Sequence, residues 1–456
     1  MRLSHEIRAL LVLALPVTLS QFAQYALALV NTAVIGRVSA LALATAAYAT
    51  AIYYLFFMVL QGTLLAVAPH VAQAHAAGNR AGVARALVNG LKLAALLALV
   101  ATPLLWTAAH LLQSFSPPGI DAPLAAAYLR VYSLAMLPVL SFSVLRGTME
   151  ALGRPRTVLM VAVLGVLAAT LLSPALAFGY LGLPALGLIG AGYATVIIAW
   201  LTALTLALLS ARTLRGYGVR RHLRPFDRSF LLELFKLGAP IGLTLGAEGG
   251  MFSTTALLMG NFGGEALAAH SVAIQTVTAV FMVPLGLSIA TSIRVAQAAG
   301  RGNLRGARQA GVAGLLLSAA VMIGVASLYL FSPTLPIRAF IDVGDPSNMR
   351  VVSVAATFLG IAALFQLFDG VQVTANAALR GLKDTRGPMV ISLASYWVVG
   401  VGSGVALAFG TELQGRGLWL GLVAGLAVAA ALLLRRFVRL TATAWRHGRA
   451  TGDERD

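Results

Sequence analysis

Long apolar stretches alternate with short polar ones along the whole chain. Each apolar run has roughly 20 or more residues, enough to cross about 30 Å of hydrocarbon as a helix. Lipid cannot satisfy free backbone groups, and the alternation typical of a barrel strand is absent, so we expect helices. The twelve predicted spans are residues 8–36, 41–70, 84–112, 122–148, 157–180, 187–213, 230–260, 266–298, 305–331, 350–379, 386–411 and 416–440.

The composition agrees with this pattern. The 456 residues are 59% hydrophobic and only 11% charged, whereas a soluble domain has about 25% charged residues. We therefore expect a polytopic membrane protein. The first span is too long for the apolar part of a signal peptide, and a second span follows at once, so we expect it to be retained. The chain has no cysteine, which excludes disulfides and thiolate sites.

The positive charges are distributed unevenly, although the net charge of +18 by itself suggests a nucleic-acid partner. Most of the 33 Lys and Arg residues lie in the N-terminus, around the loops after even-numbered spans and in the C-terminal tail. The exceptions are Arg37, Arg130, Arg338, Arg350 and Arg416. This pattern predicts that both termini are cytoplasmic. We interpret Arg220, Arg221, Arg224 and Arg228 as topology signals that contact anionic lipids, and we expect no nucleic-acid binding.

The chain contains an internal repeat with an offset of 224 residues. Pro16 aligns with Pro240, and the segments 71–86 and 295–310 share eight identities in sixteen positions. Each aligned segment contains a Gly-Asn pair, at residues 78–79 and 302–303, which predicts a turn into the next span. We predict an all-α fold of twelve transmembrane helices in two pseudo-symmetric six-helix lobes. The predicted parts are lobe 1–215, basic linker 216–229, lobe 230–441 and tail 442–456.

A repeat with an even number of spans places both copies in the same orientation. Two parallel six-helix bundles are typical of a transporter, with a substrate path at or within the bundles. The chain lacks the P-loop, HExxH and GxSxG motifs, which argues against ATP-driven pumping and the commoner hydrolytic chemistries. We expect no enzyme activity.

Two carboxylates, Glu248 and Asp369, lie deep inside predicted spans. An ionisable group at membrane depth costs roughly 2.5–3.5 kcal/mol on insertion scales, so it usually marks an ion or substrate path. No Lys or Arg lies deep enough in a span to neutralise them. Reversible protonation or cation binding is therefore favoured over the alternative, protonated acids that hydrogen-bond neighbouring helices as packing groups.

Polar residues share one helical face with Asp369. Gln366 lies three residues before it and Asn376 seven residues after it, a pattern that a lipid-facing helix would not carry. Phe365, one turn before Asp369, has a ring that could interact with a cation.

Other residues are weaker candidates for the wall of a substrate cavity. Gln24 is the repeat counterpart of Glu248, and Tyr25 follows it. Tyr53, Tyr54, Tyr396 and Trp397 could line an amphipathic surface, although interfacial anchoring or packing is the ordinary role of such residues. His270 could relay protons, or it could be a packing histidine.

The chain resembles the multidrug and toxin extrusion (MATE) family, and most closely its NorM-like branch. The most specific segment is FDGVQVTANAALRGLKDTRGP, in which the acid, Leu-Arg-Gly and Lys-Asp-Thr-Arg stand in the family's order and spacing. The resemblance implies an antiporter that exports amphipathic, often cationic compounds in exchange for H⁺ or Na⁺, with no other cofactor or metal. It implies that Glu248 and Asp369 form the cation site of the C-terminal lobe.

The sequence departs from the family at three places. Phe365 replaces a tyrosine that is common in the branch, Asn31 occupies the region of an acid that is common on the first helix, and Ala169 and Ser173 replace asparagines. Asn31 cannot supply a charge, so coupling is expected to rest on the C-terminal pair, and Asn31 remains a candidate for the cavity wall.

We expect a monomer in a bacterial inner membrane. Two alternatives stay open: a lipid-linked sugar flippase of the wider superfamily, which would be expected to have basic residues in its cavity, and a non-transporting membrane scaffold.

Overall fold

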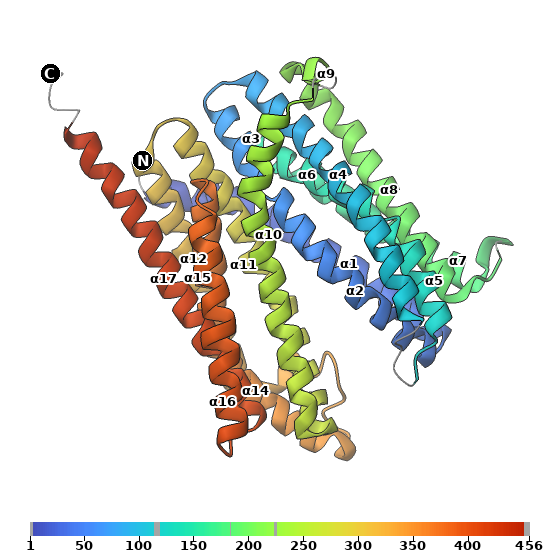
Figure 1. The fold of residues 1–456 in the computed structure, drawn as a ribbon. Coiled ribbons are helices and arrows are strands. Elements are labelled where there is room, and N and C mark those ends of the chain that lie inside the picture. The colour runs from blue at the N-terminus through green and yellow to red at the C-terminus, as the bar shows by residue number, and fades with distance from the viewer. Residues whose placement is uncertain (1–2, 114–118, 183, 223–225, 451–456) are drawn as a thin grey trace. The chain divides into compact units, whose positions relative to one another are not determined.

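A computed structural model describes residues 3–113, 119–182, 184–222 and 226–450, which are mostly helical and contain no strand (Figure 1). Within them, 12 helical segments are long and apolar enough to cross a membrane, which confirms the predicted number. Each predicted span coincides with one of these segments, and most of the observed helices extend a few residues further. Of the predicted linker, Arg224 and the side chains of Arg220 and Arg221 lie outside the described part, as do residues 451–456 of the tail.

The first half of the chain forms six spans, two of which consist of two helices each. The elements are α1 (Leu3–Val38), α2 (Ala40–Leu64) with α3 (Val67–Ala76), α4 (Arg80–Leu112), α5 (Ala122–Ser133) with α6 (Met136–Ala151), α7 (Pro155–Phe178), and α8 (Gly187–Leu214). Short helices follow α7 and α8, namely η1 (Tyr180–Gly182), η2 (Arg215–Tyr217) and α9 (Val219–His222).

The second half forms the other six spans. The elements are α10 (Arg228–Met259) with η3 (Gly260–Phe262), α11 (Gly264–Gly300), α12 (Leu304–Phe331), α13 (Thr334–Ile337), η4 (Pro346–Asn348) with α14 (Met349–Gly381), α15 (Arg386–Leu393), the π-helix η5 (Ala394–Val401), α16 (Gly402–Gly410) and α17 (Gly415–Ala450). The eleventh span is therefore an α-helix interrupted by a π-helix, which no pattern in the sequence predicts.

The two Gly-Asn pairs form turns, as predicted. Gly78 and Gly302 both have a φ of 71°, in the left-handed region that glycine tolerates best. Asn79 and Asn303 then begin α4 and α12 as N-caps, each accepting a hydrogen bond of 2.8 Å through Oδ1 from a backbone N–H three residues later. The repeat is thus preserved at the level of capping geometry.

The contacts within the chain define two compact units that differ from the two halves of the repeat. One unit is Leu19–Gly242, and the other combines Met1–Thr18 with Leu243–Asp456. The changes fall two residues after Pro16 in α1 and after Pro240 in α10, so they obey the 224-residue offset. A proline inside a helix removes one backbone hydrogen bond. Each of these two helices therefore changes unit just after a weakened point.

Each unit has its own packing centre. In the unit of residues 19–242, α4 packs against α3, α5 and α6, and α7 packs against α8. In the other unit, α14 packs against α11, α12 and α17. Because α14 is surrounded by helices of its own unit, polar residues on it are removed from lipid and need partners inside the protein.

Candidate functional site

The structure brings Glu248 of α10 and Asp369 of α14 together within one unit. Asp369 is only 3% exposed, and its Oδ1 has no hydrogen-bond partner. Glu248 is half-buried. The two carboxyl groups lie close enough for direct electrostatic interaction. Two ionised carboxylates in a poorly hydrated site repel each other strongly, so a proton or another cation bound between them would stabilise the pair.

The polar face of α14 is buried along much of its length. Gln366 is fully buried; its Nε2 donates to the carbonyl of Val277 in α11 at 3.2 Å, and its Oε1 has no partner. Gln372, one turn after Asp369, donates through Nε2 to the hydroxyl of Tyr396. Asn376 is half-buried. Unpaired buried oxygens on Gln366, Asp369 and Gln372 leave this face with spare acceptors, which suits a cation better than an apolar ligand.

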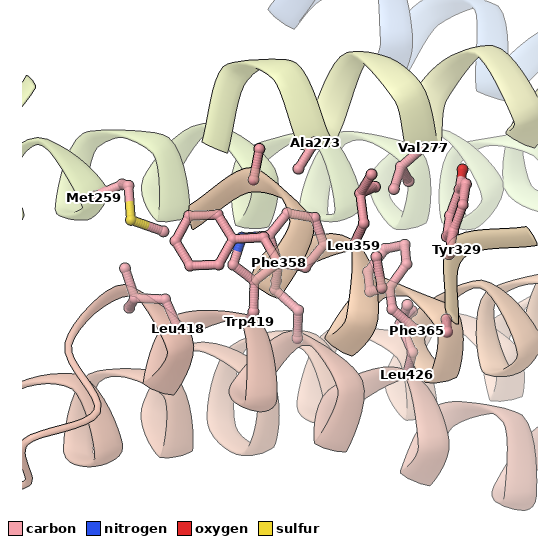
Figure 2. Close-up of a cluster of buried hydrophobic side chains, with 14 of the residues drawn as sticks. Met259, Ala273, Val277, Tyr329, Phe358, Leu359, Phe365, Leu418, Trp419 and Leu426 are labelled. Atoms are coloured by element: carbon pink, nitrogen blue, oxygen red, sulfur yellow. The ribbon is translucent and has the colours of Figure 1, made fainter. Parts of the chain in front are cut away.

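Phe365 lies in an apolar cluster. Its ring centroid is 6.0 Å from that of Phe252 and 5.8 Å from that of Trp419. Figure 2 shows the ring among Leu359, Leu426 and other fully buried side chains of the cluster. The ring therefore supports the position of the Asp369 helix through packing, whether or not it also contacts a cation.

His270 in α11 lies against the same cluster. It is 2% exposed, its ring centroid is 5.6 Å from that of Trp419, and its Nδ1 has no hydrogen-bond partner. The aromatic contact agrees with packing, while the free nitrogen leaves a proton-relay role open as a prediction.

The weaker candidates of the first half lie in the other unit. The side-chain amide of Asn31 lies near the hydroxyl of Tyr128, and both Oδ1 of Asn31 and this hydroxyl are buried without a hydrogen-bond partner. Gln24 and Tyr25 also bury polar atoms, Nε2 and the hydroxyl, that have no partner. These atoms could bind a polar group of a substrate, and none of them carries a charge.

A group of aromatic side chains lies in this unit and was only partly predicted. Tyr53 lies 5.9 Å from Tyr54 and 4.7 Å from Tyr132, and Tyr132 lies 5.5 Å from Tyr128, all measured between ring centroids. Tyr53 and Tyr54 were predicted from the sequence, whereas the pair on α5 was not. The spacing of Tyr128 and Tyr132, one helical turn apart, was the signal that could have found them.

Charged contacts near the start of α1 and of α10 were also missed. Glu6 of α1 pairs with Arg294 of α11 within one unit, with Nη2 at 2.8 Å from both carboxylate oxygens. Glu233 of α10 pairs with His70 of α3 within the other unit, at 3.3 Å. His70 and Arg294 are repeat counterparts, since their positions differ by 224. Both copies of the repeat therefore hold the start of a long helix through a basic side chain at the same position.

A further ion pair holds the residue before α10. The guanidinium of Arg85 lies 2.6 Å from Asp227 and 4.4 Å from the ring centroid of Phe230. The hydrogen bond from Arg85, with a second from the N–H of Phe230, lowers the pKa of Asp227 to about 2. Asp227 thus stays ionised at physiological pH and fixes the entry into α10.

No group of three or more His, Cys, Asp or Glu residues that could hold a metal ion occurs among the described residues. The two carboxylates are the chemically distinctive pair of the described spans.

Comparison with known proteins identifies the family. The MatE family model matches residues 16–175 and 240–405, two segments whose starts differ by the repeat offset. The chain is 54% identical over 445 residues to the "Probable multidrug resistance protein NorM" of Deinococcus radiodurans, covering 98% of this chain and 97% of that protein. It is 39% identical over 441 residues to the protein of the same name from Pseudomonas aeruginosa, covering 96% and 90% of the two chains.

Solved structures show the same fold. The eukaryotic MATE transporter AtDTX14 aligns with a TM-score of 0.83 at 22% identity, covering 98% of this chain and 99% of that one. A MATE protein in complex with MaL6 aligns with a TM-score of 0.87 at 19% identity, covering 97% of each chain. The predicted all-α, twelve-helix fold is confirmed, and the predicted absence of enzyme activity agrees with a family of transporters. The chain belongs to the MATE family and is a NorM-like, multi-pass membrane protein.

Proposed function

We propose that the chain is a multidrug efflux antiporter that exports amphipathic, cationic compounds in exchange for H⁺ or Na⁺, and that Glu248 and Asp369 bind the coupling cation. The NorM names of its relatives support multidrug export. The observation that carries the coupling proposal is the pairing of two carboxylates on α10 and α14, one of them 3% exposed with an unpaired oxygen.

The electrostatics of the pair supply a mechanism. An unpaired carboxylate in a buried site is strongly destabilised, so the cation-free site has a high free energy. Binding of a proton or Na⁺ relieves this, and each charge that crosses the field gains roughly 2.3 kcal/mol per 100 mV. In the proposed cycle, the cation enters from outside, neutralises Glu248 and Asp369, and favours release of substrate. Loss of the cation to the cytoplasm restores the charged site and the affinity for a cationic substrate.

The two copies of the repeat are proposed to have different roles in transport. The repeat counterpart of Glu248 is Gln24, and Asn31 lies near Tyr128, so the first half offers polar and aromatic groups without formal charge. We propose that these groups contribute to a substrate cavity while coupling rests on the second half. The six-helix lobes 1–215 and 230–441 are the two copies of the repeat in this scheme.

The charge distribution suggests the setting. We propose a bacterial inner membrane, cytoplasmic termini and contacts between the basic cytoplasmic loops and anionic lipids. A monomer is sufficient for this mechanism, because both carboxylates belong to one chain.

The test is efflux of ethidium from proteoliposomes with proton and sodium gradients imposed separately. Asp369→Asn is expected to abolish gradient-driven efflux, because the amide carries no charge and does not titrate, while the protein stays folded. Asn31→Ala is expected to reduce efflux much less. A matched control is Asp121→Asn, which also removes one acid but preserves the N-cap of α5, since asparagine caps as well as aspartate.

Unchanged efflux in Asp369→Asn would contradict the coupling proposal. Complete loss of efflux in Asn31→Ala would contradict the division between the halves. If the wild-type chain moves no ethidium under either gradient, the flippase and scaffold alternatives would be favoured instead.

A further inference from the structure

The π-helix η5, residues 394–401, touches both helices that carry the acids. A π-helix has i→i+5 hydrogen bonds, is rare, and commonly occurs at functional sites. Here it interrupts the eleventh span between α15 and α16. The sequence ASYWVVGV contains no proline that would force the change of register. Its contacts with other helices therefore stabilise this register.

The contact with α14 is a buried hydrogen bond beside Asp369. Gln372 is 1% exposed and Tyr396 is fully buried, and Nε2 of Gln372 donates to the tyrosine hydroxyl. Gln372 lies one turn after Asp369 on the same helix. The hydroxyl of Tyr396 is thus held at the depth of the carboxylate by a residue that has no other side-chain hydrogen bond.

The contact with α10 is made directly beyond Glu248. A β-carbon placed on Gly250 would lie 3.0 Å from the ring of Trp397, and one placed on Gly400 would lie 3.5 Å from the sulfur of Met251. Glycine at these positions lets the π-helix approach α10 closely. The same eight residues therefore lie against α10 within one turn of one acid and against α14 within one turn of the other.

The hydroxyl of Tyr396 can still donate one hydrogen bond. A hydroxyl has one proton to donate, and its oxygen already accepts the bond from Gln372. Asp369 has a buried oxygen with no partner, and Tyr396 interacts electrostatically with both Glu248 and Asp369. The hydroxyl of Ser392, one turn earlier, also lies near Tyr396 and is the competing acceptor. A carboxylate is the stronger acceptor, because hydrogen bonds to charged groups are roughly twice as strong as neutral ones.

We propose that Tyr396, oriented by Gln372, is a positioning residue of the coupling site that donates a hydrogen bond to the cation-free carboxylate pair and releases it when a cation binds. This inference rests on the proposed function of Glu248 and Asp369. A bound proton or Na⁺ removes the charge that attracts the hydroxyl proton. Cation binding thereby removes a hydrogen bond that restrains residues 394–401.

Movement of the π-helix would reach α17 directly. A β-carbon on Gly425 would lie 2.8 Å from the Cα of Gly400 and 2.9 Å from the carbonyl oxygen of Ser395, so the backbones are in contact. There is no side chain between them to absorb a shift. The route from the carboxylates to the eleventh and twelfth spans is therefore short and rigid.

The test is Tyr396→Phe, which keeps the ring and removes the donor. Because the hydroxyl stabilises the cation-free site, its loss is expected to tighten cation binding. The half-saturating cation concentration for ethidium efflux should fall roughly tenfold, the effect of one charge-assisted hydrogen bond, with no rise in maximal rate. A matched control is Tyr193→Phe at the exposed Tyr193 of α8, where the half-saturating concentration should not change.

A second measurement does not depend on transport. In the purified full chain, hydrogen exchange of residues 394–401 is expected to depend on added Na⁺ or on pH in the wild type, and this dependence should disappear in Tyr396→Phe. If that variant does not fold, Gln372→Met is expected to lower the half-saturating concentration in the same direction, since it frees the hydroxyl from its orienting donor.

The outcomes separate the two proposals. An unchanged or raised half-saturating concentration in both variants, while Asp369→Asn still abolishes efflux, would overturn the role of Tyr396 and leave the coupling site standing. A raised value would indicate that the tyrosine oxygen binds the cation itself. Absence of any cation dependence in the wild type would overturn the proposed function and this inference with it.

Discussion

The ion pair between Glu6 and Arg294 predicts that one substitution near the N-terminus destabilises the chain strongly. Arg294 donates to both carboxylate oxygens, at 2.8 Å from Nη2 to each and 3.3 Å from Nε to one, and it also donates to Gln297 at 3.3 Å. The side chains are 5% and 18% exposed for Glu6 and Arg294. Glu6→Gln keeps the size of the side chain and one acceptor but removes the charge, leaving a largely buried guanidinium without its counter-ion.

The expected magnitude follows from this burial. Breaking a buried pair by removing one partner costs about 3–5 kcal/mol, and the partial exposure of Arg294 reduces this to about 2–3 kcal/mol. The contact made by His70, the repeat counterpart of Arg294, offers an internal comparison. Glu233 is 55% exposed and faces His70, so Glu233→Gln is expected to cost less than about 1 kcal/mol.

The assay is thermal unfolding of the detergent-purified chain at one fixed scan rate, because large proteins often unfold irreversibly. For a unit of this size, 1 kcal/mol shifts the Tm by about 2–4 °C, so Glu6→Gln should lower it by about 4–12 °C and Glu233→Gln by less than about 4 °C. Arg294→Lys, which keeps the charge and loses the two-pronged geometry, should fall between them. Equal shifts for the two glutamate variants would refute the argument from burial.

Two further predictions concern the entry into α10 and the contact between the last two spans. The pKa of Asp227 lies below its ordinary value of 3.8, so its pairing with Arg85 contributes stability above that value and is lost only as the pH falls through about 2. Protection of residues 226–233 from hydrogen exchange, corrected for intrinsic rates, should therefore be equal at pH 5 and pH 7.5 in the wild type. In Asp227→Asn the protection should be lower at both pH values. A loss of protection at pH 5 in the wild type would contradict this prediction. Gly421→Ala should destabilise the chain by about 1–3 kcal/mol, because its β-carbon would lie 2.3 Å from the Cα of Gly404. Gly324→Ala in α12, where no atom lies within 4 Å of the added carbon, should be neutral or slightly stabilising in the same thermal assay.

The spans could be predicted from the sequence because each is a run of apolar residues long enough to cross the bilayer. The breaks inside spans could not. Helices α2 and α3 are separate, as are α5 and α6, at residues that are as apolar as their neighbours. The π-helix at 394–401 is invisible for the same reason, since hydropathy reports the environment of a side chain and not the register of backbone hydrogen bonds. Glycine at 400 and 421 is the local signal that packing is close at this point.

The carboxylates could be found from the sequence because a charge inside an apolar run has no ordinary explanation. Residues near span ends were harder to interpret. Arg294 and Glu6 lie where polar residues are expected, so they look like topology signals, and nothing local indicates that they meet across 288 residues. The same holds for Tyr396, which is one aromatic residue among several. Tyr396 is significant because Gln372 holds its hydroxyl at the depth of Asp369, and only the tertiary structure shows this contact.

The two copies of the repeat differ at equivalent positions 70 and 294, where each holds the start of a long helix. At position 294 one copy of the repeat uses arginine, which keeps its charge at any physiological pH. At the equivalent position 70 the other copy uses histidine, whose Nδ1 lies 2.9 Å from the carbonyl oxygen of Ala66 and whose Nε2 lies 3.3 Å from Glu233. Both of these partners are acceptors, so the two hydrogen bonds form together only when both ring nitrogens carry a proton. Arg294 therefore holds one helix entry with a permanent charge, whereas a neutral His70 has one N–H and can make only one of its two hydrogen bonds. Glu248 and Asp369 lie in the unit with the arginine contact, whereas the unit with the histidine contact contains Gln24, the uncharged repeat counterpart of Glu248.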